Sequence, residues 1–505
     1  MKRFVSILLL LVFSVTAQAT ETTVKILHTN DTHARIIPID SKLYGKNVSG
    51  AIRRASFISK IKQQAPDTLV LDSGDMFQGT PFFTFFKGEA CYKIAKAMGY
   101  DATTLGNHEL DNSLSLLLEK LRISDMLLLC CNVFYRNTDK PVFKPYEIFE
   151  RFGKKIAVIG SIGDEAWDVI DRKTKAPLYA KPQFETVKEF VSKVRNDVDL
   201  VIVLSHSGFE KDKLMAARVP GIDVILGGHS HTEVNNPVLV TNAANKNGIA
   251  GTIVTQAGEH GIFVGMLDLT MSEDGQIATY SGGLHIIDST ITEEPNPEVA
   301  KLVKFYHEQL KSKMAQIAGK SEFELSYPKD QKKVKLLPMG SFTAMAMKDC
   351  VNADVCLVNS GGIRAGIKAG NITWGQIFEA LPYDNTVVTF LMKGKDVKKM
   401  FDFVAKNPDK LDGFQFAGIS GTIDQVKGEC TGLKINNEII DDEKIYRICT
   451  SSFIANGNLG GDLLFANCES IEDSSIFMRE AAIKYLEKVK ELQDFSKNPL
   501  TLIAQ

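Results

Sequence analysis

Short apolar runs alternate with amphipathic segments through the first half of the chain, from residue 24 to about residue 269. The run at 69–71, for example, precedes a segment at 89–98 whose apolar residues have helical spacing, and another run follows at 102–105. Short apolar runs are typical of buried strands, whereas helical spacing indicates helices that face a core on one side. The alternation therefore predicts a layered α/β domain.

A second pattern begins near residue 299, where apolar residues recur with helical spacing up to residue 310 and predict a helix. Apolar runs that predict the strands of another α/β region follow at 355–358, 387–391 and 446–449. We therefore expect a first domain at 20–290, a linker helix at 291–319 and a second domain at 320–505.

The N-terminus has the composition of a secretory leader. Lys2 and Arg3 precede an apolar run at 4–15, and small residues follow that end at Ala19. A membrane anchor would need about 20 apolar residues, so the shorter run predicts a signal peptide, residues 1–19, that is removed by cleavage. We expect a periplasmic or secreted protein without a membrane anchor.

The composition is that of a globular protein, since 44% of the 505 residues are hydrophobic and 24% are charged. These values exclude a disordered chain and a coiled coil. The formal net charge of −2 provides no basic surface for nucleic acid. Eight cysteines leave the disulfide pattern open, because neither their number nor their spacing selects a pairing. The expected protein is a monomer or dimer that does not bind nucleic acid.

Polar residues that could bind metal follow directly after the predicted strands. In an open α/β sheet such loops meet at the carboxyl edge of the strands, where ligand sites form. A single Asp or His after a strand is usually a cap or a surface residue, but several together are specific. The candidates are Asp31 and His33 after 24–27, Asp75 after 69–71, Asn107 and His108 after 102–105, His206 after 201–204, and His229 and His231 after 224–226.

This mixture of carboxylate, amide and imidazole ligands suits two divalent ions such as Zn, Mn, Fe or Co, because a structural zinc site favours thiolates. Asp75 is the natural bridge, since one carboxylate can give an oxygen to each ion. Two such ions lower the pKa of water and stabilise both oxygens of an in-line displacement at phosphorus. The donor set thus predicts hydrolysis of a phosphate ester. His260 is a weaker candidate, and we expect it to be an ordinary loop residue.

At these residues the chain resembles the dinuclear metallophosphoesterases, and specifically the 5′-nucleotidase and UDP-sugar hydrolase family. The resemblance implies a four-layer α/β/β/α metallophosphoesterase domain joined by a linker helix to an α/β C-terminal substrate-binding domain. The motifs that carry it are Thr29-Asn30-Asp31-Thr32-His33, Ser73-Gly74-Asp75, Gly106-Asn107-His108-Glu109-Leu110-Asp111, Gly227-Gly228-His229-Ser230-His231 and Asn359-Ser360-Gly361-Gly362-Ile363-Arg364.

The same resemblance implies roles for the metal-site residues. His108 would stabilise the developing charge or help the leaving oxygen, with Asp111 orienting its imidazole. His231 stands where some members have an amide side chain, a departure that bears on metal preference. One metal would be held by Asp31, His33, Asp75 and His231, and the other by Asp75, Asn107, His206 and His229.

For the second domain, the resemblance implies that Asn359 and Arg364 contact the nucleotide. Tyr383 and Phe453 would stack on the two faces of the base, although without the resemblance each ring would be interpreted as a core aromatic. Asp462 would bind the ribose hydroxyls. The match around it is partial, because the family has a glycine where this chain has a leucine, and two residues before Asp462 look inserted.

The expected function is metal-dependent removal of the 5′-phosphate from nucleoside monophosphates, with UDP-sugars or nucleotide polyphosphates as further substrates. The expected cofactors are two divalent metal ions, Zn, Mn or similar. Alternatives within the family are a 2′,3′-cyclic-nucleotide phosphodiesterase with 3′-nucleotidase activity and a thiosulfohydrolase. A nucleotide-binding protein without catalysis is an alternative of another class, but the complete set of ligands argues against it.

Overall fold

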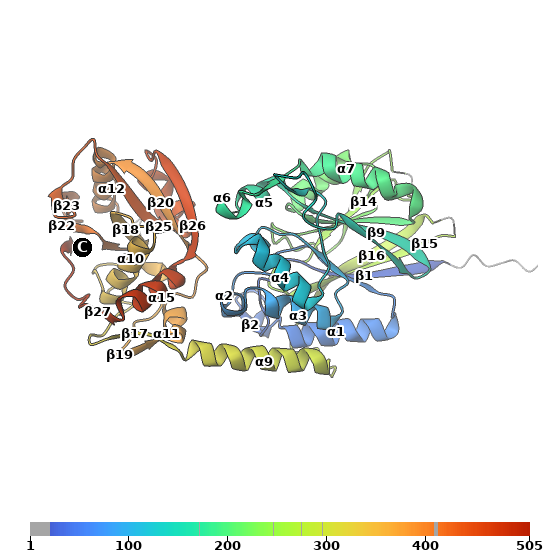
Figure 1. Ribbon diagram of the computed structural model, residues 1–505, viewed down its shortest axis with the longest axis horizontal. Coiled ribbons are helices and arrows are strands. Elements are labelled where there is room, and N and C mark those ends of the chain that lie inside the picture. The colour runs from blue at the N-terminus through green and yellow to red at the C-terminus, as the bar shows by residue number, and fades with distance from the viewer. Residues whose placement is uncertain are drawn as a thin grey trace, which may run out of the picture. The chain divides into compact units, whose positions relative to one another are not determined.

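The computed structural model describes residues 21–170, 172–245, 247–273, 275–294, 296–408 and 413–504. The predicted signal peptide at 1–19 lies outside these residues. The chain forms two compact units, which divide within helix α9 (Pro297–Met314) between Val303 and Lys304 (Figure 1). The helix predicted from the apolar spacing after residue 299 is therefore confirmed, while the domain boundaries derived from the sequence remain a prediction.

The first unit contains a six-stranded sheet with the order β16-β15-β1-β4-β5-β6. The four strands from β1 to β6 are parallel, and β15 pairs antiparallel with both β1 and β16. The strands are β1 (Thr22–Thr29), β4 (Leu69–Asp72), β5 (Ala102–Thr104), β6 (Leu128–Leu129), β15 (Phe263–Met271) and β16 (Ile277–Ile286).

The second sheet of this unit also has six strands, in the order β13-β14-β12-β11-β9-β8. Its four central strands are parallel, and its two edge strands are antiparallel to their neighbours. The strands are β8 (Tyr146–Arg151), β9 (Lys154–Ile162), β11 (Leu200–His206), β12 (Val224–Gly227), β13 (Val238–Thr241) and β14 (Gly251–Gln256).

Alternation of side chains along β9 shows how the layers are held together. Ile156 and Val158 belong to a buried cluster with residues of the first sheet, whereas Ala157 and Ile159 pack with residues of α7 (Gln183–Val194) and α8 (Phe209–Arg218). Successive residues of a strand point to opposite faces, so β9 is buried on both.

The opposite side of the unit carries α1 (Ala51–Gln64), α3 (Glu89–Met98) and α4 (Leu114–Ser124), which Figure 1 shows across the strands from α7. The four-layer α/β/β/α arrangement is confirmed. Shorter elements of this unit include α2 (Pro81–Phe86), α5 (Asp164–Asp168), β2 (Ile39–Ser41), β3 (Gly45–Val48), β7 (Val133–Tyr135) and β10 (Leu178–Ala180).

The second unit is also α/β, as predicted. A five-stranded sheet has the order β21-β18-β25-β20-β26, and a four-stranded sheet has the order β24-β23-β22-β28. One buried cluster joins residues of both sheets to α12 (Gly394–Lys406). The strands are β18 (Val355–Asn359), β20 (Thr386–Lys393), β21 (Phe414–Ala417), β22 (Ile419–Asp424), β23 (Glu429–Ile435), β24 (Glu438–Ile439), β25 (Ile445–Ser451), β26 (Ser470–Phe477) and β28 (Leu500–Ile503).

Further elements of this unit surround the two sheets. They are β17 (Ile317–Ser321), β19 (Gly370–Thr373) and β27 (Glu491–Leu492), which form a small sheet, and the helices α10 (Pro338–Cys350), α11 (Trp374–Ala380), α13 (Ser452–Ala455), α14 (Gly461–Leu464) and α15 (Met478–Val489). Among the helices in the described ranges, none is both long and apolar enough to cross a membrane.

Candidate functional site

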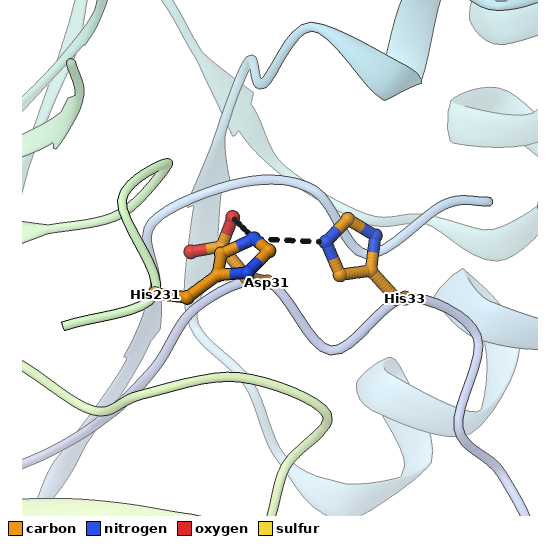
Figure 2. A group of neighbouring side chains, drawn as sticks. All are labelled: Asp31, His33 and His231. Carbon is orange, nitrogen blue, oxygen red and sulfur yellow. Dashed lines mark hydrogen bonds and ion pairs between the residues drawn. The ribbon is translucent and has the colours of Figure 1, made fainter. Parts of the chain in front are cut away.

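Loops at the carboxyl ends of β1 and β12 bring together a first group of side chains that could hold a metal ion, Asp31, His33 and His231 (Figure 2). Nε2 of His231 lies 3.3 Å from Oδ1 of Asp31 and 3.3 Å from Nε2 of His33. The three ligand atoms lie within 4.8 Å of one another. One carboxylate oxygen and two imidazole nitrogens thus converge on a single point.

A second group forms where β4, β5, β11 and β12 end, and it contains Asp75, His206 and His229. Nε2 of His206 lies 3.2 Å from Oδ2 of Asp75. Oδ1 of Asn107 joins this group, 3.2 Å from Nε2 of His206 and 3.1 Å from Nδ1 of His229. The structure therefore brings together, in two clusters, the seven residues to which the resemblance assigns metal binding.

The two groups are neighbours, because His229 and His231 lie on one loop and the backbone N–H of His229 donates to Oδ2 of Asp31 over 3.0 Å. Burial alone would raise the pKa of Asp75, but the charges of His206 and His108 hold it well below its usual range. Asp75 thus faces an accumulation of imidazoles. Its role as the bridge between two ions remains a prediction.

The hydrogen bonds behind the histidines test whether the donor set fits a metal. Nδ1–H of His33 donates to the carbonyl of Phe77 over 3.1 Å, and Nδ1–H of His206 donates to that of Ser73 over 2.8 Å. A carbonyl only accepts, so in the neutral form of both rings the lone pair lies on Nε2, the atom that faces the group. Nδ1 of His231 lies 2.8 Å from Glu259 and is oriented in the same manner. Three imidazole Nε2 atoms can thus offer lone pairs beside the carboxylates of Asp31 and Asp75, so the donor set fits divalent ions.

Five of the seven candidate ligands have a left-handed backbone conformation. A positive φ is uncommon for residues other than glycine, and each such residue costs about 1–3 kcal/mol unless its surroundings hold it. Backbone hydrogen bonds tie the first two ligand loops together, from Asp31 N to Gly74 O and from His33 N to Asp75 O. The ligands with positive φ are Asp31 (49°), His33 (46°), Asp75 (55°), His229 (76°) and His231 (54°).

Glu109 belongs to one of the motifs found in the sequence, but the sequence assigned it no role. Its buried carboxylate accepts hydrogen bonds from the backbone N–H groups of Asp75, Met76 and Gly106, at 3.0, 2.9 and 2.8 Å. It therefore holds the loop after β4 against the loop after β5. Gly106 completes this contact, because a Cβ there would lie 2.1 Å from Oδ1 of Asp75.

His108 lies at the edge of the second group without belonging to it. Its Nδ1 is 2.8 Å from Oδ2 of Asp111, and its backbone N–H donates to Oδ1 of Asp75 over 2.9 Å. Burial would lower the pKa of His108, but the carboxylates of Asp111 and Asp75 raise it to about 10. His260 lies outside both groups, with its ring centroid 5.8 Å from that of His33.

The predicted residues of the second unit lie at the end of β18, in loops and in the short helices α13 and α14. Asn359 ends β18 and is buried, with Oδ1 accepting from Ser451 over 3.2 Å, whereas Arg364 and Asp462 are exposed. The side chains of Tyr383 and Phe453 are 48% and 37% exposed, which excludes their interpretation as core aromatics. Figure 1 labels β18, β20 and β25, the strands next to Asn359, Tyr383 and Phe453 in the sequence.

Tyr383 and Phe453 lie at the same end of one strand pair. Tyr383 comes just before β20 and Phe453 just after β25, and these antiparallel strands align Val387 with Ser451. The backbone N–H of Thr386 also donates to Oγ of Ser452 over 3.0 Å, which joins the two segments.

Arg479, on α15, is a second residue that the sequence did not single out. It is 2% exposed, its Nη1 donates to the carbonyl of Tyr383 over 3.1 Å, and its Nη2 pairs with Asp384. The guanidinium lies 5.0 Å from the ring centroid of Phe378 and 4.6 Å from that of Phe477. An arginine thus anchors the segment that carries the exposed Tyr383 ring.

Comparison with known families matches residues 24–233 to the calcineurin-like phosphoesterases and residues 314–465 to the 5′-nucleotidase C-terminal domain. The 5′-nucleotidase of Bos taurus is 28% identical, across 87% of this chain and 84% of that protein. Protein UshA of Yersinia enterocolitica is also 28% identical, across 87% and 86%. The trifunctional nucleotide phosphoesterase YfkN of Bacillus subtilis is 27% identical, but this chain spans only 34% of its length.

Among solved structures, a 5′-nucleotidase precursor from Thermus thermophilus superposes with a TM-score of 0.62 and 26% identity, over 96% of this chain and all of that one. The NAD nucleotidase of Haemophilus influenzae reaches a TM-score of 0.72 at 22% identity, over 96% and 100%, and shares the fold. Calcineurin-like phosphoesterases use two divalent metal ions, and the two groups described above supply a donor set for each. The chain belongs to the 5′-nucleotidase family of metal-dependent phosphohydrolases.

Proposed function

We propose that this protein removes the 5′-phosphate from nucleoside monophosphates with the help of two divalent ions, Zn or Mn. The observation that carries this proposal is the combination on one chain of two adjacent metal-donor groups and a pair of exposed aromatic rings. A phosphatase for small esters needs the donors but has no use for the rings. The combination therefore favours a phosphate ester with a large planar leaving group.

The donor groups would hold one ion at Asp31, His33 and His231 and the other at His206, His229 and Asn107, with Asp75 shared. When bound, the two ions supply Lewis-acid stabilisation of the phosphoryl oxygens and lower the pKa of water.

The chain's own contribution to the chemistry centres on His108. Asp111 engages its Nδ1, which leaves Nε2 to donate a hydrogen bond to a phosphoryl or leaving oxygen. Asp111 holds the ring of His108 at Nδ1, and the carboxylate of Asp75 holds the backbone N–H of the same residue. The two contacts together fix the orientation of the ring. Asp111 is therefore a positioning residue that holds the proton of Nδ1.

For the nucleoside part, we assign stacking on the base to Tyr383 and Phe453 and binding of the ribose hydroxyls to Asp462. Arg364 is exposed and can form a two-pronged, charge-assisted pair with phosphate oxygens. Each aromatic face contributes about 0.5–1.5 kcal/mol beyond the area it buries. Stacking does not depend on which base is bound, and the assigned residues include no hydrogen bond that selects one base. We therefore expect several nucleoside monophosphates to serve as substrates.

The proposal is tested by a phosphate-release panel over AMP, UMP, UDP-glucose, ATP, 2′,3′-cyclic AMP and 3′-AMP, with Mn or Zn added. The expected result is fastest release from AMP and UMP. UDP-glucose and ATP test whether the activity extends to diphosphate sugars and polyphosphates. Preference for 2′,3′-cyclic AMP and 3′-AMP would select the cyclic phosphodiesterase alternative, and no turnover of any nucleotide would refute the proposal. Protein freed of metal with a chelator is the matched control.

We also propose that the protein is exported and loses residues 1–19. The support is the leader composition around Lys2, Arg3 and Ala19. Expression of the full gene product in a cell that exports proteins, followed by N-terminal sequencing, should give a mature chain that begins at Thr20. Recovery of the uncleaved N-terminus would contradict this proposal.

A further inference from the structure

Glu259 places a carboxylate behind one of the candidate metal ligands. Its Oε2 lies 2.8 Å from Nδ1 of His231, within hydrogen-bonding distance. The other ring nitrogen, Nε2, faces the first group and lies 3.3 Å from Oδ1 of Asp31. An ionised carboxylate only accepts, so beside a neutral ring it favours the tautomer with the proton on Nδ1 and the lone pair on Nε2. Glu259 thus acts on the side of His231 that a metal ion would leave free.

This backing differs in charge from that of the other histidines in the two groups. Nδ1–H of His33 and Nδ1–H of His206 both donate to backbone carbonyls, which are neutral acceptors. At His231 the group behind the ring is a carboxylate. A negative charge at that position fixes the ring and makes its free nitrogen more basic, and so a stronger donor to a cation.

The backbone on both sides of Glu259 is tied to the two loops that carry the first group. The N–H of Gly258 donates to the carbonyl of Thr232 over 3.0 Å, and Thr232 directly follows the ligand on the loop after β12. The N–H of His260 donates to the carbonyl of Asp31 over 2.7 Å. The carboxylate is therefore presented from a segment whose position is set by the ligand loops themselves.

Folding stability does not explain the contact between Glu259 and His231. Their side chains are 39% and 37% exposed. Ion pairs with this degree of exposure contribute little to stability, because water screens the charges and two side chains must be ordered. Orientation of the ligand is the effect that remains.

We propose that Glu259 is a positioning residue for the first metal ion, which it serves by holding the ring of His231 and strengthening its Nε2 as a donor. This inference rests on the metal assignment within the proposed function. Loss of a group that supports a ligand in this way typically weakens metal binding by about 10- to 100-fold.

The first test measures zinc affinity on the full-length, metal-free protein by competition with a chromophoric chelator. Glu259→Gln keeps an acceptor oxygen but removes the charge, so one of the two ions should bind about tenfold more weakly. Glu259→Ala removes both the acceptor and the charge, so the loss should approach about 100-fold. Unchanged affinity in both variants overturns the proposal.

Glu233→Gln is the matched control. Glu233 lies two residues after His231 in the sequence, and its carboxylate accepts from the hydroxyl of Tyr44. This variant loses the same charge close to the site without touching the ligand, and it should bind zinc as the unmodified protein does. An equal loss of affinity in Glu233→Gln would assign the effect to the general negative charge of the region and overturn the proposal.

A double-mutant cycle tests whether Glu259 acts through His231. His231→Ala removes the ring, so adding Glu259→Ala to that variant should weaken zinc binding no further. Additive losses would mean that Glu259 is itself a ligand or acts on another group, and the proposal would be wrong.

The melting temperature of the metal-free proteins separates positioning from a structural role. Metal-free Glu259→Ala should melt at the temperature of the unmodified metal-free protein. A marked fall would assign Glu259 to holding its loop and overturn the proposal.

These measurements also distinguish failure of this inference from failure of the proposed function, because none of them uses a nucleotide. An unmodified protein that binds no zinc would refute both. Two ions bound by the unmodified protein, with equal affinities in the Glu259 variants, would overturn the role of Glu259 alone.

Discussion

Asp75 faces imidazoles of both ligand groups, and its replacement tests the dinuclear assignment directly. Asp75→Asn removes one anionic oxygen that we assign to the shared position, so metal binding should be lost or badly weakened. Activity should fall by several orders of magnitude. The measurement is metal content per chain by elemental analysis together with phosphate release.

Asp268→Asn is a matched carboxylate change in the same unit, since Asp268 pairs with Lys25 away from the ligands, and it should leave metal content unchanged. An Asp75→Asn protein with two metals per chain and near-native turnover would show that Asp75 is no ligand.

His108 should affect the rate and not the metal. His108→Ala removes a hydrogen-bond donor at the developing charge, so kcat should fall by about 10²- to 10⁴-fold while KM changes little. Asp111→Asn keeps the ring but disturbs its orientation, and should cause a smaller loss of the same kind. If His108→Ala instead loses metal, the residue is a ligand.

The proximity of the candidate ligands was predictable from the sequence, because their residue types suit a metal site and their positions follow predicted strands. The ligand residues stand directly after apolar runs, and their donor atoms are those that divalent ions prefer. Glu109 and Glu259 were not predictable, because Glu109 binds backbone groups of distant loops and Glu259 binds a histidine that is close only in the fold. A buried carboxylate that serves backbone donors has no sequence pattern of its own.

At the scale of elements, Glu109 joins the loops that follow β4 and β5. Glu109→Gln replaces one acceptor oxygen by an N–H donor, which leaves at least one buried backbone N–H without a partner, a loss of about 1–3 kcal/mol. We expect a lower melting temperature and weaker metal binding, measured by thermal denaturation and metal titration. Glu119→Gln, an exposed change on α4, is the control and should have little effect. Unchanged metal affinity in Glu109→Gln would show that the loops hold their positions without it.

Helix α15 provides the corresponding support in the second unit. Arg479→Lys keeps the positive charge but cannot bind the Tyr383 carbonyl and Asp384 together while stacking on two rings. The Tyr383 segment should loosen, so KM for AMP should rise about tenfold, which corresponds to about 1.4 kcal/mol. Kinetics on p-nitrophenyl phosphate, which has no base to stack, should be spared.

Two further variants separate positioning from folding. Asp384→Asn weakens the same anchor from its partly exposed side and should give the same KM effect in a milder form. Equal losses on AMP and on p-nitrophenyl phosphate in both variants would mean that the anchor only stabilises the fold of this unit.

Elements themselves were predictable to a large extent, because burial on both faces makes a strand an apolar run. The runs at 69–71 and 224–226 correspond to β4 (Leu69–Asp72) and β12 (Val224–Gly227). Which strands lie next to each other in a sheet was not predictable from these apolar runs. The partner of β1 on one side is β15, more than two hundred residues away in the sequence, and only tertiary packing decides that β15 runs antiparallel.

For the whole molecule, the sequence indicated two α/β regions and a helix between them, and the structure divides within that helix. The buried cluster around α12 in the second unit consists of residues beyond 335, while three clusters of the first unit lie before 287. Each unit therefore has a core of its own, which is the condition for independent cooperative unfolding.

This separation predicts how metal removal acts on the full chain. The candidate ligands all lie in the first unit, and an ion that binds only the folded state raises the stability of the unit to which it binds. Scanning calorimetry of the full-length protein should show two transitions, and a chelator should lower the temperature of one while leaving the other in place. In Asp75→Asn, the sensitive transition should already occur at the lower temperature and should no longer respond to the chelator. A single transition that moves as a whole would mean that the two cores unfold together, and the division within α9 would then have no thermodynamic counterpart.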